Sequence, residues 1–286
     1  MALGARAALE AVGQLPDVEI DIAGAALQLA RVDAADADWT GAEAHLSTLA
    51  REAIDLARGV APGDLPARAG ALAGLLTGRH GYRGDTDTYD DPCNANLIHV
   101  IERRRGLPVA LGVLWLHCAR AIGWGAHGID FPGHFLLALE ADPVGKGRAA
   151  PASQQIVLDV FAGGLPLEAR GLRALLKRVG GAEVELKPGV LQPMSARRVL
   201  LRLQDNIRIR RLQVADYAGA LDCTDSMLAI APDHAPLWRE AAMMNERLDQ
   251  IASALKCYSR FLDLVPDGDA AAQTRAAMDE LRTRLN

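Results

Sequence analysis

The feature that most constrains this chain is an internal repeat in its last third, where residues recur at an offset of 34 positions. Pro232-Asp233 returns as Pro266-Asp267. The same offset relates three further pairs: Ala220-Leu221 and Ala254-Leu255, Cys223 and Cys257, and Leu228 and Leu262. A fixed period of this length is typical of a helix–turn–helix unit. One such unit cannot bury its own apolar face, so we expect neighbouring units to stack into a helical array.

A period of 34 residues is the one that tetratricopeptide repeats show. The second unit fits the pattern well, whereas the first is degenerate. The diagnostic residues of the second unit are Trp238 near its start, Ala254 and Tyr258 midway, and Pro266 at its end. Residues 270–285 are expected to form a capping helix with a charged outer face, because the end of such an array must be polar.

The repeat divides the chain into two predicted domains. Residues 191–286 are expected to hold the tetratricopeptide-like helices, and residues 1–190 a front domain that includes N-terminal helices. No linker rich in Gly and Ser separates them. Cys223 and Cys257 occupy equivalent positions in the two repeats, so we expect small packing residues there and not reactive thiols.

Charge and composition exclude several classes of function. The 286-residue chain has a formal net charge of −5, which argues against non-specific nucleic-acid binding because that requires a basic surface. No stretch reaches the ~18 apolar residues that suggest a membrane span, and the N-terminus shows no secretory signal. Four cysteines are too few for a disulfide framework, and none has zinc-site spacing. We expect a cytoplasmic protein without a metal or cofactor.

The front domain is predicted to begin with helices and then to change character. Residues 78–92 are rich in Gly, Asp, Thr and Tyr and are expected to form a loop, long enough to have a functional role. Asn94 is expected to begin the next helix and Gly106 to close it. Pro108 then stands at a favoured first-turn position of a helix that is apolar nearly all round, which predicts a helix buried at the domain centre.

Two strands are predicted after this helix, at residues 134–139 and 155–160, with a hairpin loop at residues 142–153 between them. In an antiparallel hairpin the numbers of directly opposed residues add to a constant. If that constant is 293, His134 lies opposite Asp159. Directly opposed side chains share a face, with Cβ atoms ~5 Å apart. In that assumed register the Asp159 carboxylate can hold the His134 imidazole.

Four stretches of sequence, following Tyr82-x-Gly84 and Asn94 in a characteristic order, carry a family resemblance. They are Glu102-Arg103-Arg104-Arg105-Gly106-Leu107-Pro108, Ala119-Arg120-Ala121-Ile122-Gly123, Phe131-Pro132-Gly133-His134-Phe135 and Leu158-Asp159-Val160-Phe161-Ala162-Gly163-Gly164. Together they resemble the bacterial SirB-type transglutaminase-like family with C-terminal tetratricopeptide repeats, over nearly the whole chain from about Glu19. The resemblance implies an α+β fold: a transglutaminase-like (papain-like) core with N-terminal helices, followed by an α-helical tetratricopeptide-type segment.

The resemblance also implies a site in which a nucleophilic cysteine begins the central helix, with His and Asp on neighbouring strands. His134 and Asp159 match the last two positions. In such a site the helix N-terminus and the imidazole lower the thiol pKa, and the carboxylate orients the imidazole. The cysteine expected near Pro108 is absent, because Gly106 to Val109 hold no nucleophile. This loss is typical of the SirB-type branch, and it leaves open whether the chain is an enzyme.

Two other cysteines are candidates to replace the missing nucleophile. Cys118 lies about three turns further along the same helix, roughly 15 Å from its start, so it cannot fill the role. Cys93 precedes a predicted helix, where a thiolate is favoured. It is either a nucleophile or a small residue at a turn.

Three hypotheses for function follow. In the leading one, the chain is a non-catalytic adaptor that binds a peptide or protein partner through its helical repeats and a groove near the remnant pair His134–Asp159. The expected binding residues are Asn94, Arg105, Tyr82 and Trp238. The alternative is an amide hydrolase or acyltransferase that uses Cys93, or water activated by the His134–Asp159 pair. In the third, the front domain is a rigid platform and only the repeats bind. The sequence leaves the partner, the substrate and the oligomeric state open.

Overall fold

The computed structural model describes residues 2–61, 63–141, 155–181, 183–186 and 189–285. The chain divides into two compact units: residues 16–203, and residues 1–15 together with residues 204–286. The sequence-based boundary stood at residue 190. In the front unit the elements are α2 (Ile22–Asp33), α3 (Trp39–Ala57), α4 (Leu65–Ala73), a π-helix (Gly74–Arg79), β1 (Arg83–Gly84), a 3-10 turn (Pro92–Asn94), α5 (Leu97–Arg103), β2 (Arg105–Gly106), α6 (Pro108–Ile122), β3 (Ala126–Phe131), β4 (His134–Glu140), β5 (Gln155–Asp159), β6 (Leu165–Pro166), α7 (Ala169–Gly180) and β7 (Pro193–Met194). The repeat unit has α1 (Ala2–Gln14), α9 (Tyr217–Ile230), α10 (Ala235–Arg247), α11 (Ile251–Leu264) and α12 (Asp269–Leu285), and α8 (Ala196–Gln213) spans residue 203.

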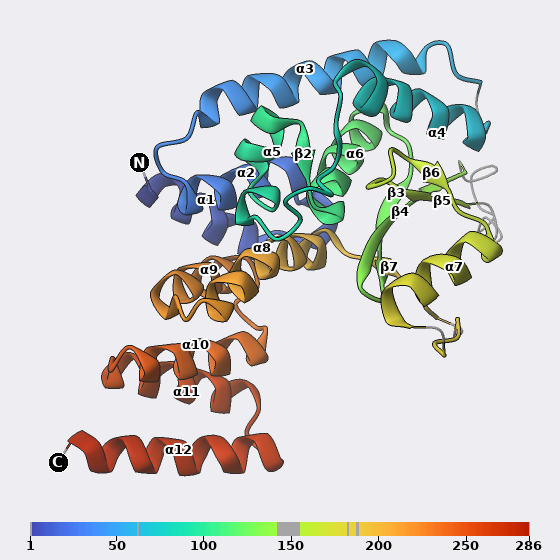
Figure 1. The fold of residues 1–286 in the computed structure, drawn as a ribbon. Helices are drawn as coiled ribbons and strands as arrows, with labels where there is room; N and C mark the ends of the chain where they lie inside the picture. The colour runs from blue at the N-terminus through green and yellow to red at the C-terminus, as the bar shows by residue number, and fades with distance from the viewer. Residues whose placement is uncertain (1, 62, 142–154, 182, 187–188, 286) are drawn as a thin grey trace. The chain divides into compact units, whose positions relative to one another are not determined.

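An antiparallel sheet with strand order β6-β5-β4-β3-β7 forms the middle layer of the front unit. Because side chains alternate along a strand, β4 presents Leu136 and Ala138 to α7 on one face and Phe135 to α6 on the other. Figure 1 shows α6 and α7 on opposite sides of the sheet. The α+β prediction is confirmed.

The central helix α6 is buried along most of its length, as its apolar sequence predicts. Pro108 is its first residue, and Leu107 is an N-cap that offers no side-chain hydrogen bond. A Cβ built on Gly112 would lie 2.2 Å from Cε1 of Phe135. Only glycine therefore lets α6 approach β4 this closely, and the helix start is held at the strand that carries His134.

The strand register differs from the assumed one. Leu137 pairs with Leu158 and Glu140 with Gln155, so the numbers of opposed residues add to 295 and not to 293. Asp159 is then opposite Leu136, one diagonal step from His134. A slip of two residues keeps every side chain on its face, whereas a slip of one reverses them all. The apolar pattern therefore cannot distinguish these two registers. The predicted hairpin loop at residues 142–153 lies outside the described residues.

Two predicted helix ends and one strand need correction. Asn94 ends a 3-10 turn, and α5 begins at Leu97 with Asn96 as its side-chain cap. The helix closes at Arg104, which takes the left-handed conformation with φ 57°, while Gly106 belongs to β2. Contacts of the Arg104 guanidinium, described below, offset the cost of that backbone. Strand β3, at residues 126–131, was not predicted because Gly and Asp interrupt its apolar pattern.

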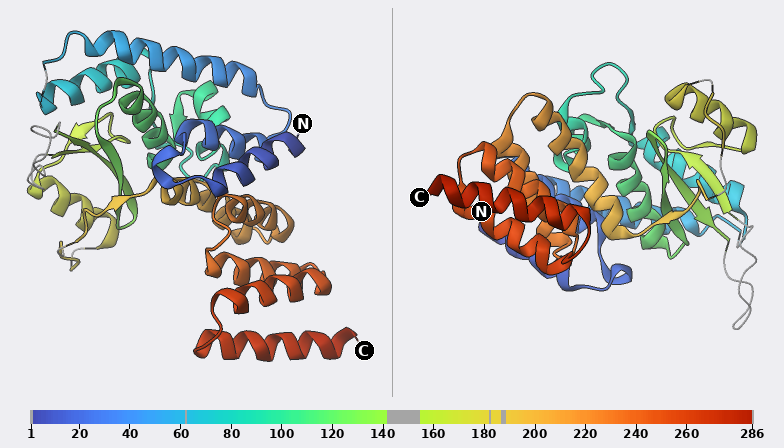
Figure 2. Two further views of the ribbon diagram at one scale, coloured as in Figure 1. Left: turned by 180° about the vertical axis from the view of Figure 1, so that it is seen from behind. Right: turned by 90° about the horizontal axis from the view of Figure 1, so that it is seen from below.

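The helices of the repeat unit follow the 34-residue period. Helices α9 and α11 begin 34 residues apart (251 − 217) and end 34 apart (264 − 230), and α10 and α12 begin 34 apart (269 − 235). The turn residues Ala215 and Asp249 both have φ 57° at the same offset. Figure 2 shows α9 to α12 stacked in chain order. The predicted capping helix is α12.

Cys223 and Cys257 also occupy equivalent places in the structure. The Arg211 guanidinium contacts Sγ of Cys223, and the amide of Asn245, 34 residues further on, contacts Sγ of Cys257. All four cysteines of the chain are free. Burial raises the pKa of Cys257 to about 11, which agrees with a packing role.

Candidate functional site

His134 and Asp159 form a buried hydrogen-bonded pair at one end of the sheet. Nε2 of His134 lies 2.9 Å from Oδ1 of Asp159, and only 7% and 4% of the two residues is exposed. The same carboxylate oxygen accepts the backbone N–H groups of Phe161 at 3.1 Å and Ala162 at 3.3 Å. The pairing on which the sequence hypothesis depended is therefore present, reached diagonally across the strands.

The surroundings of Asp159 favour its ionised form. Burial by itself would raise the pKa of the carboxyl group, because a charge is poorly solvated there. The hydrogen bond and charge of His134, together with the N–H groups of Ala162 and Phe161, outweigh burial, and the pKa of Asp159 lies below its usual range. The carboxylate thus orients the imidazole, as a general base requires.

We expect the chain to lose more stability on acidification than its Asp159→Asn variant does. The pKa of Asp159 is lower in the folded chain than the value of about 3.9 in an unfolded one. Its stabilisation is therefore fully present above that unfolded value and is lost as the pH falls through the folded one. Urea unfolding in steps from pH 6 to pH 2 measures the difference. Parallel curves for the two proteins would contradict the assignment.

An aromatic group covers the His134 ring. Phe161 stands edge-on to it with ring centroids 6.1 Å apart, and Tyr89 stands edge-on to Phe161 at 5.9 Å. The chain at Gly84 passes directly under Phe161, since a Cβ there would lie 2.5 Å from the ring. These contacts bring the Gly- and Asp-rich loop to the pair. Phe161 and Tyr89 were missed, although Phe161 follows Asp159 by only two residues.

Arg202 of α8 anchors the backbone of the same histidine. Its guanidinium donates to the carbonyl oxygen of His134 at 2.7 Å and pairs with Asp130 on β3. The sequence offered no signal for this contact, because Arg202 lies 68 residues from His134.

No thiol that favours its ionised form accompanies the pair. The start of α6, from Leu107 to Val109, is buried and apolar. Burial raises the pKa of Cys118 to about 12. Burial and the neighbouring Asp91 carboxylate raise the pKa of Cys93 as well. Burial is the larger of the two causes and Asp91 adds to it, so the pKa of Cys93 shifts away from the favoured thiolate that the nucleophile hypothesis requires.

The loop beside the pair is organised around Asp85, which the sequence did not single out. Asp85 accepts the N–H groups of Thr88 at 2.9 Å and Asp87 at 3.1 Å, and pairs with Arg103 at 3.0 Å. The hydrogen bonds from Thr88 lead the causes that lower the pKa of Asp85 to about 2. A short polar segment with an aspartate three residues before a threonine was the available signal.

Each of the four predicted binding residues has contacts of its own. Asn94 is buried and donates to the Thr88 carbonyl at 2.6 Å. Tyr82 is buried and accepts from Arg104, which also binds Nε2 of His45 at 2.6 Å. Arg105 pairs with Asp87 at 3.9 Å, and Trp238 donates to the Pro232 carbonyl at 2.8 Å. The side chains of Asn94 and Tyr82 therefore face the interior.

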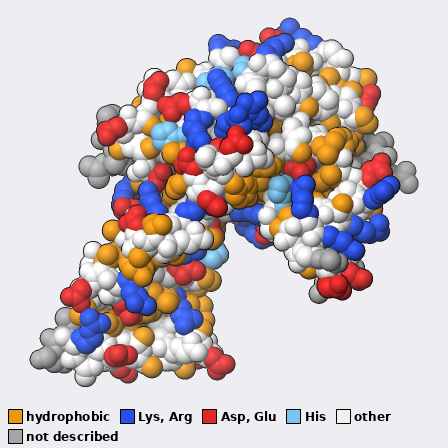
Figure 3. All heavy atoms as spheres, viewed as in Figure 1, with side chains coloured by type: hydrophobic (Ala, Val, Ile, Leu, Met, Phe, Trp, Pro, Cys, Tyr) orange, Lys and Arg blue, Asp and Glu red, His pale blue; other side chains and the backbone are white. Residues whose placement is uncertain are grey.

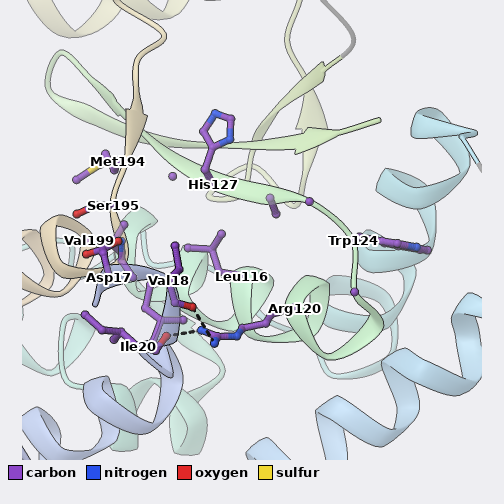
Figure 4. Close-up of a pocket in the computed structure, with 16 residues that line it drawn as sticks. Asp17, Val18, Ile20, Leu116, Arg120, Trp124, His127, Met194, Ser195 and Val199 are labelled. Carbon is purple, nitrogen blue, oxygen red and sulfur yellow. Dashed lines mark hydrogen bonds between the residues drawn. The ribbon is translucent and has the colours of Figure 1, made fainter. Parts of the chain in front are cut away.

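A cavity of about 450 Å³ in the front unit is lined by α6, β3, the start of α8 and residues 17–22 (Figure 4). Two of its charged groups are bonded within the wall: Arg120 donates to the carbonyls of Val18 and Ile20, and Asp17 accepts N–H groups of Ala196 and Arg197. His127 points away from the other lining residues (Figure 4). The lining does not include His134 or Asp159.

A second cavity, of about 390 Å³, lies in the repeat unit, and we call it the repeat groove. Helix α10 presents Arg239, Met243 and Arg247 to it at a spacing of four residues. The other lining residues are Glu246, Tyr258, Gln273, Thr274, Ala277 and Arg284. Met243 is 53% exposed, so an apolar side chain of the groove is accessible to a partner. The four-residue spacing was a readable signal in the sequence.

None of the described helices is long and apolar enough to cross a membrane. Across the residues that the structure describes, no group of three or more His, Cys, Asp or Glu side chains is placed to hold a metal ion.

Comparison with known proteins identifies two families. A model of the transglutaminase-like superfamily matches residues 40–205, and a tetratricopeptide repeat model matches residues 207–279. The chain is similar to a UPF0162 protein of Xylella fastidiosa (strain 9a5c), with 31% identity over 76% of this chain and 74% of that protein. A UPF0162 protein of Vibrio cholerae is 29% identical over 76% of this chain and 77% of that protein. F-box only protein 21 of Mus musculus is 24% identical over 54% of this chain and 24% of that protein. No solved structure matches the chain.

Proposed function

The chain belongs to the transglutaminase-like superfamily and carries tetratricopeptide repeats, and from this premise we propose that it is a non-catalytic, cytoplasmic adaptor that binds a peptide or protein segment. The observation that carries the proposal is the repeat groove, whose exposed Met243 lies between two arginines of one helix. We also propose, as the sequence predicts, that the boundary between the front domain and the repeat domain lies near residue 190.

The chemistry of the pair supports a role without catalysis. A thiol acyltransferase needs the thiol, and loss of one triad member leaves only ~10³–10⁴-fold catalysis over water. The start of α6 has no nucleophile, and the thiols of Cys93 and Cys118 have raised pKa values. The His134–Asp159 pair then serves the fold by joining β4 to the end of β5. No specific observation favours the hydrolase alternative.

The groove chemistry indicates the kind of segment that fits. Three arginines line the groove, Arg239, Arg247 and Arg284, and Arg284 also pairs with Asp249 at 3.0 Å. The one carboxylate of the lining, Glu246, already accepts from the Tyr258 hydroxyl. A partner with a carboxylate beside an aliphatic side chain would meet both an arginine and Met243. Charge pairs of this kind steer association and set specificity.

We expect peptides selected from a random 12-residue display library on the full chain to combine acidic and aliphatic residues. Met243→Glu with Arg247→Glu should weaken their binding at least about tenfold, because it removes the apolar contact and reverses a charge. Fluorescence anisotropy with the synthetic peptides measures the affinities.

A matched control is Ile54→Glu with Arg58→Glu on α3, where the side chains are also exposed. This variant should bind the peptides as the wild type does. Equal binding by the groove variant would overturn the proposed site. Robust turnover of an amide substrate that disappears in His134→Ala would overturn the adaptor itself.

A further inference from the structure

Helix α7 concentrates positive charge in a chain that is negative overall. Its 12 residues include Arg170, Arg173, Lys177 and Arg178 and no acidic residue, whereas the whole chain has a net charge of −5. At about 100° per residue, these four positions fall within one side of the helix. The buried residues Leu172, Leu175 and Leu176 occupy the opposite side.

The fold uses only the apolar side of this helix. The three leucines pack on the sheet against Leu136 and Ala138. All four cations are exposed, and none of them forms an ion pair with a residue that the structure describes. Figure 3 shows blue side chains gathered over α7, with red ones beyond its end. We call these four cations the α7 basic face.

Other arginines of the front unit pair with carboxylates. Arg103 pairs with Asp85 and Asp91, and Arg198 pairs with Asp130. Self-repulsion among four neighbouring positive charges opposes folding slightly, and the helix dipole offsets part of it because Lys177 and Arg178 lie in the last turn of α7. An acidic partner would relieve this repulsion.

Two exposed apolar side chains lie near the ends of α7. Leu165, just before the helix, is 55% exposed, and Val179, at its end, is 43% exposed. A Cβ on Gly133 would lie 2.2 Å from Cγ1 of Val179. The end of α7 therefore rests against the β3–β4 turn, directly before His134.

We propose that the α7 basic face is a docking surface for an acidic protein segment. Charge complementarity and composition support this partner. Arginine is enriched at protein interfaces, and three of the four cations are arginines. Arg170 and Lys177 are seven residues apart, about 10 Å along the helix. In an extended segment, side chains on one side recur every ~7 Å, so carboxylates two to four residues apart span the face.

The geometry is less suited to other polyanions. A membrane-surface helix inserts its apolar side into lipid, but the leucines of α7 are buried against the sheet. Nucleic-acid surfaces extend over many phosphates, whereas the basic face ends at Glu168 before the helix and at Glu183 after it. The docking surface is separate from the repeat groove and does not depend on it.

The test uses the full chain and a fluorescein-labelled deca-glutamate peptide, in anisotropy at 50 mM and 300 mM salt. We expect binding that weakens at the higher salt, because exposed charge pairs are screened. Arg173→Glu with Lys177→Glu should weaken it at least about tenfold. Arg51→Glu with Arg58→Glu on α3 makes the same change in net charge and should leave binding unaltered.

A cross-linking readout locates the peptide. Carbodiimide activation joins a glutamate carboxyl group to a lysine amine with loss of water, so it reports direct contact. We expect the peptide on Lys177 of α7 in preference to the exposed Lys256 of α11, and unchanged in Met243→Glu with Arg247→Glu. The Met243→Glu with Arg247→Glu variant alters only the repeat groove. Unchanged cross-linking to Lys177 in this variant therefore shows that the peptide binds to α7 whether or not the groove binds peptides.

Three results would overturn the proposal: equal loss of peptide binding in the α3 variant, equal cross-linking of Lys177 and Lys256, or no binding at 50 mM salt. Vesicles of phosphatidylserine and phosphatidylcholine, and a 20-base-pair DNA duplex, are the competing polyanions. If the vesicles or the duplex bind more tightly than the peptide, and if that binding is lost in Arg173→Glu with Lys177→Glu, the partner is that polyanion and not an acidic protein segment.

Discussion

Replacing Asp159 with alanine is expected to lower the free energy of unfolding by about 3 kcal/mol. The variant loses the hydrogen bond to His134 and leaves the N–H groups of Phe161 and Ala162 without an acceptor. Buried polar groups without partners cost roughly 1–3 kcal/mol each in mutational series, and breaking a buried charged pair costs roughly 3–5 kcal/mol. Urea unfolding at pH 7, followed by circular dichroism, measures the change.

Asp159→Asn separates charge from hydrogen bonding in the same experiment. The asparagine keeps an acceptor oxygen, so Asp159→Asn should lower the free energy of unfolding by about half as much as Asp159→Ala does. Asp87→Ala serves as the control, because Asp87 lies in the neighbouring loop with a 79% exposed side chain, and surface changes usually stay within ~0.5 kcal/mol. A loss in Asp159→Ala no greater than in Asp87→Ala would show that the pair contributes nothing to the fold.

Phe135→Ala is expected to cost about 4 kcal/mol, the second of the two largest effects. Phe135 is 1% exposed and fills the space between β4 and the two glycines Gly112 and Gly128. Large-to-small changes of buried aromatic residues cost roughly 3–5 kcal/mol, because lost burial and a cavity act together. The midpoint of urea unfolding should fall without a change in slope.

Ile54→Ala provides the comparison for this variant, since Ile54 is 44% exposed and should cost well under 1 kcal/mol. Phe135→Leu should recover more than half of the loss because it refills part of the cavity. If Phe135→Ala and Ile54→Ala were equally stable, α6 would not be packed on β4 as described.

The variants also separate stability from binding. Asp159 and Phe135 hold the strand that carries His134, whereas Met243 and Arg247 line the repeat groove and Lys177 lies on the α7 basic face. A chain weakened at Asp159 should still bind peptides under conditions in which it remains folded. Binding that depends on His134 and Asp159 would move the partner site to the front unit.

The candidate pair was predictable, but its geometry was not. His134 and Asp159 were found by resemblance, and the structure joins them. Phe161, Tyr89 and Arg202 were missed because their roles depend on a strand register and on a helix far along the chain. The sequence left Cys93 open as a nucleophile or a turn residue, and burial together with the Asp91 carboxylate raises its pKa, which does not favour a thiolate.

By itself, the sequence determined the features that depend on local pattern. The 34-residue period set the limits of the repeat helices, and the apolar run after Pro108 marked the buried central helix. These features follow from helix geometry and from which residues avoid water, and both are written along a single segment. Arg239, Met243 and Arg247 were readable in the same way.

Only the tertiary structure decided which of two equivalent strand registers forms and which charges remain unpaired. A slip of two residues leaves the apolar pattern between β4 and β5 unchanged, so the choice depends on packing between distant segments. The cations of α7 are ordinary in the sequence. They became informative because the fold buries the leucines of that helix and provides no described acidic partner for its opposite side.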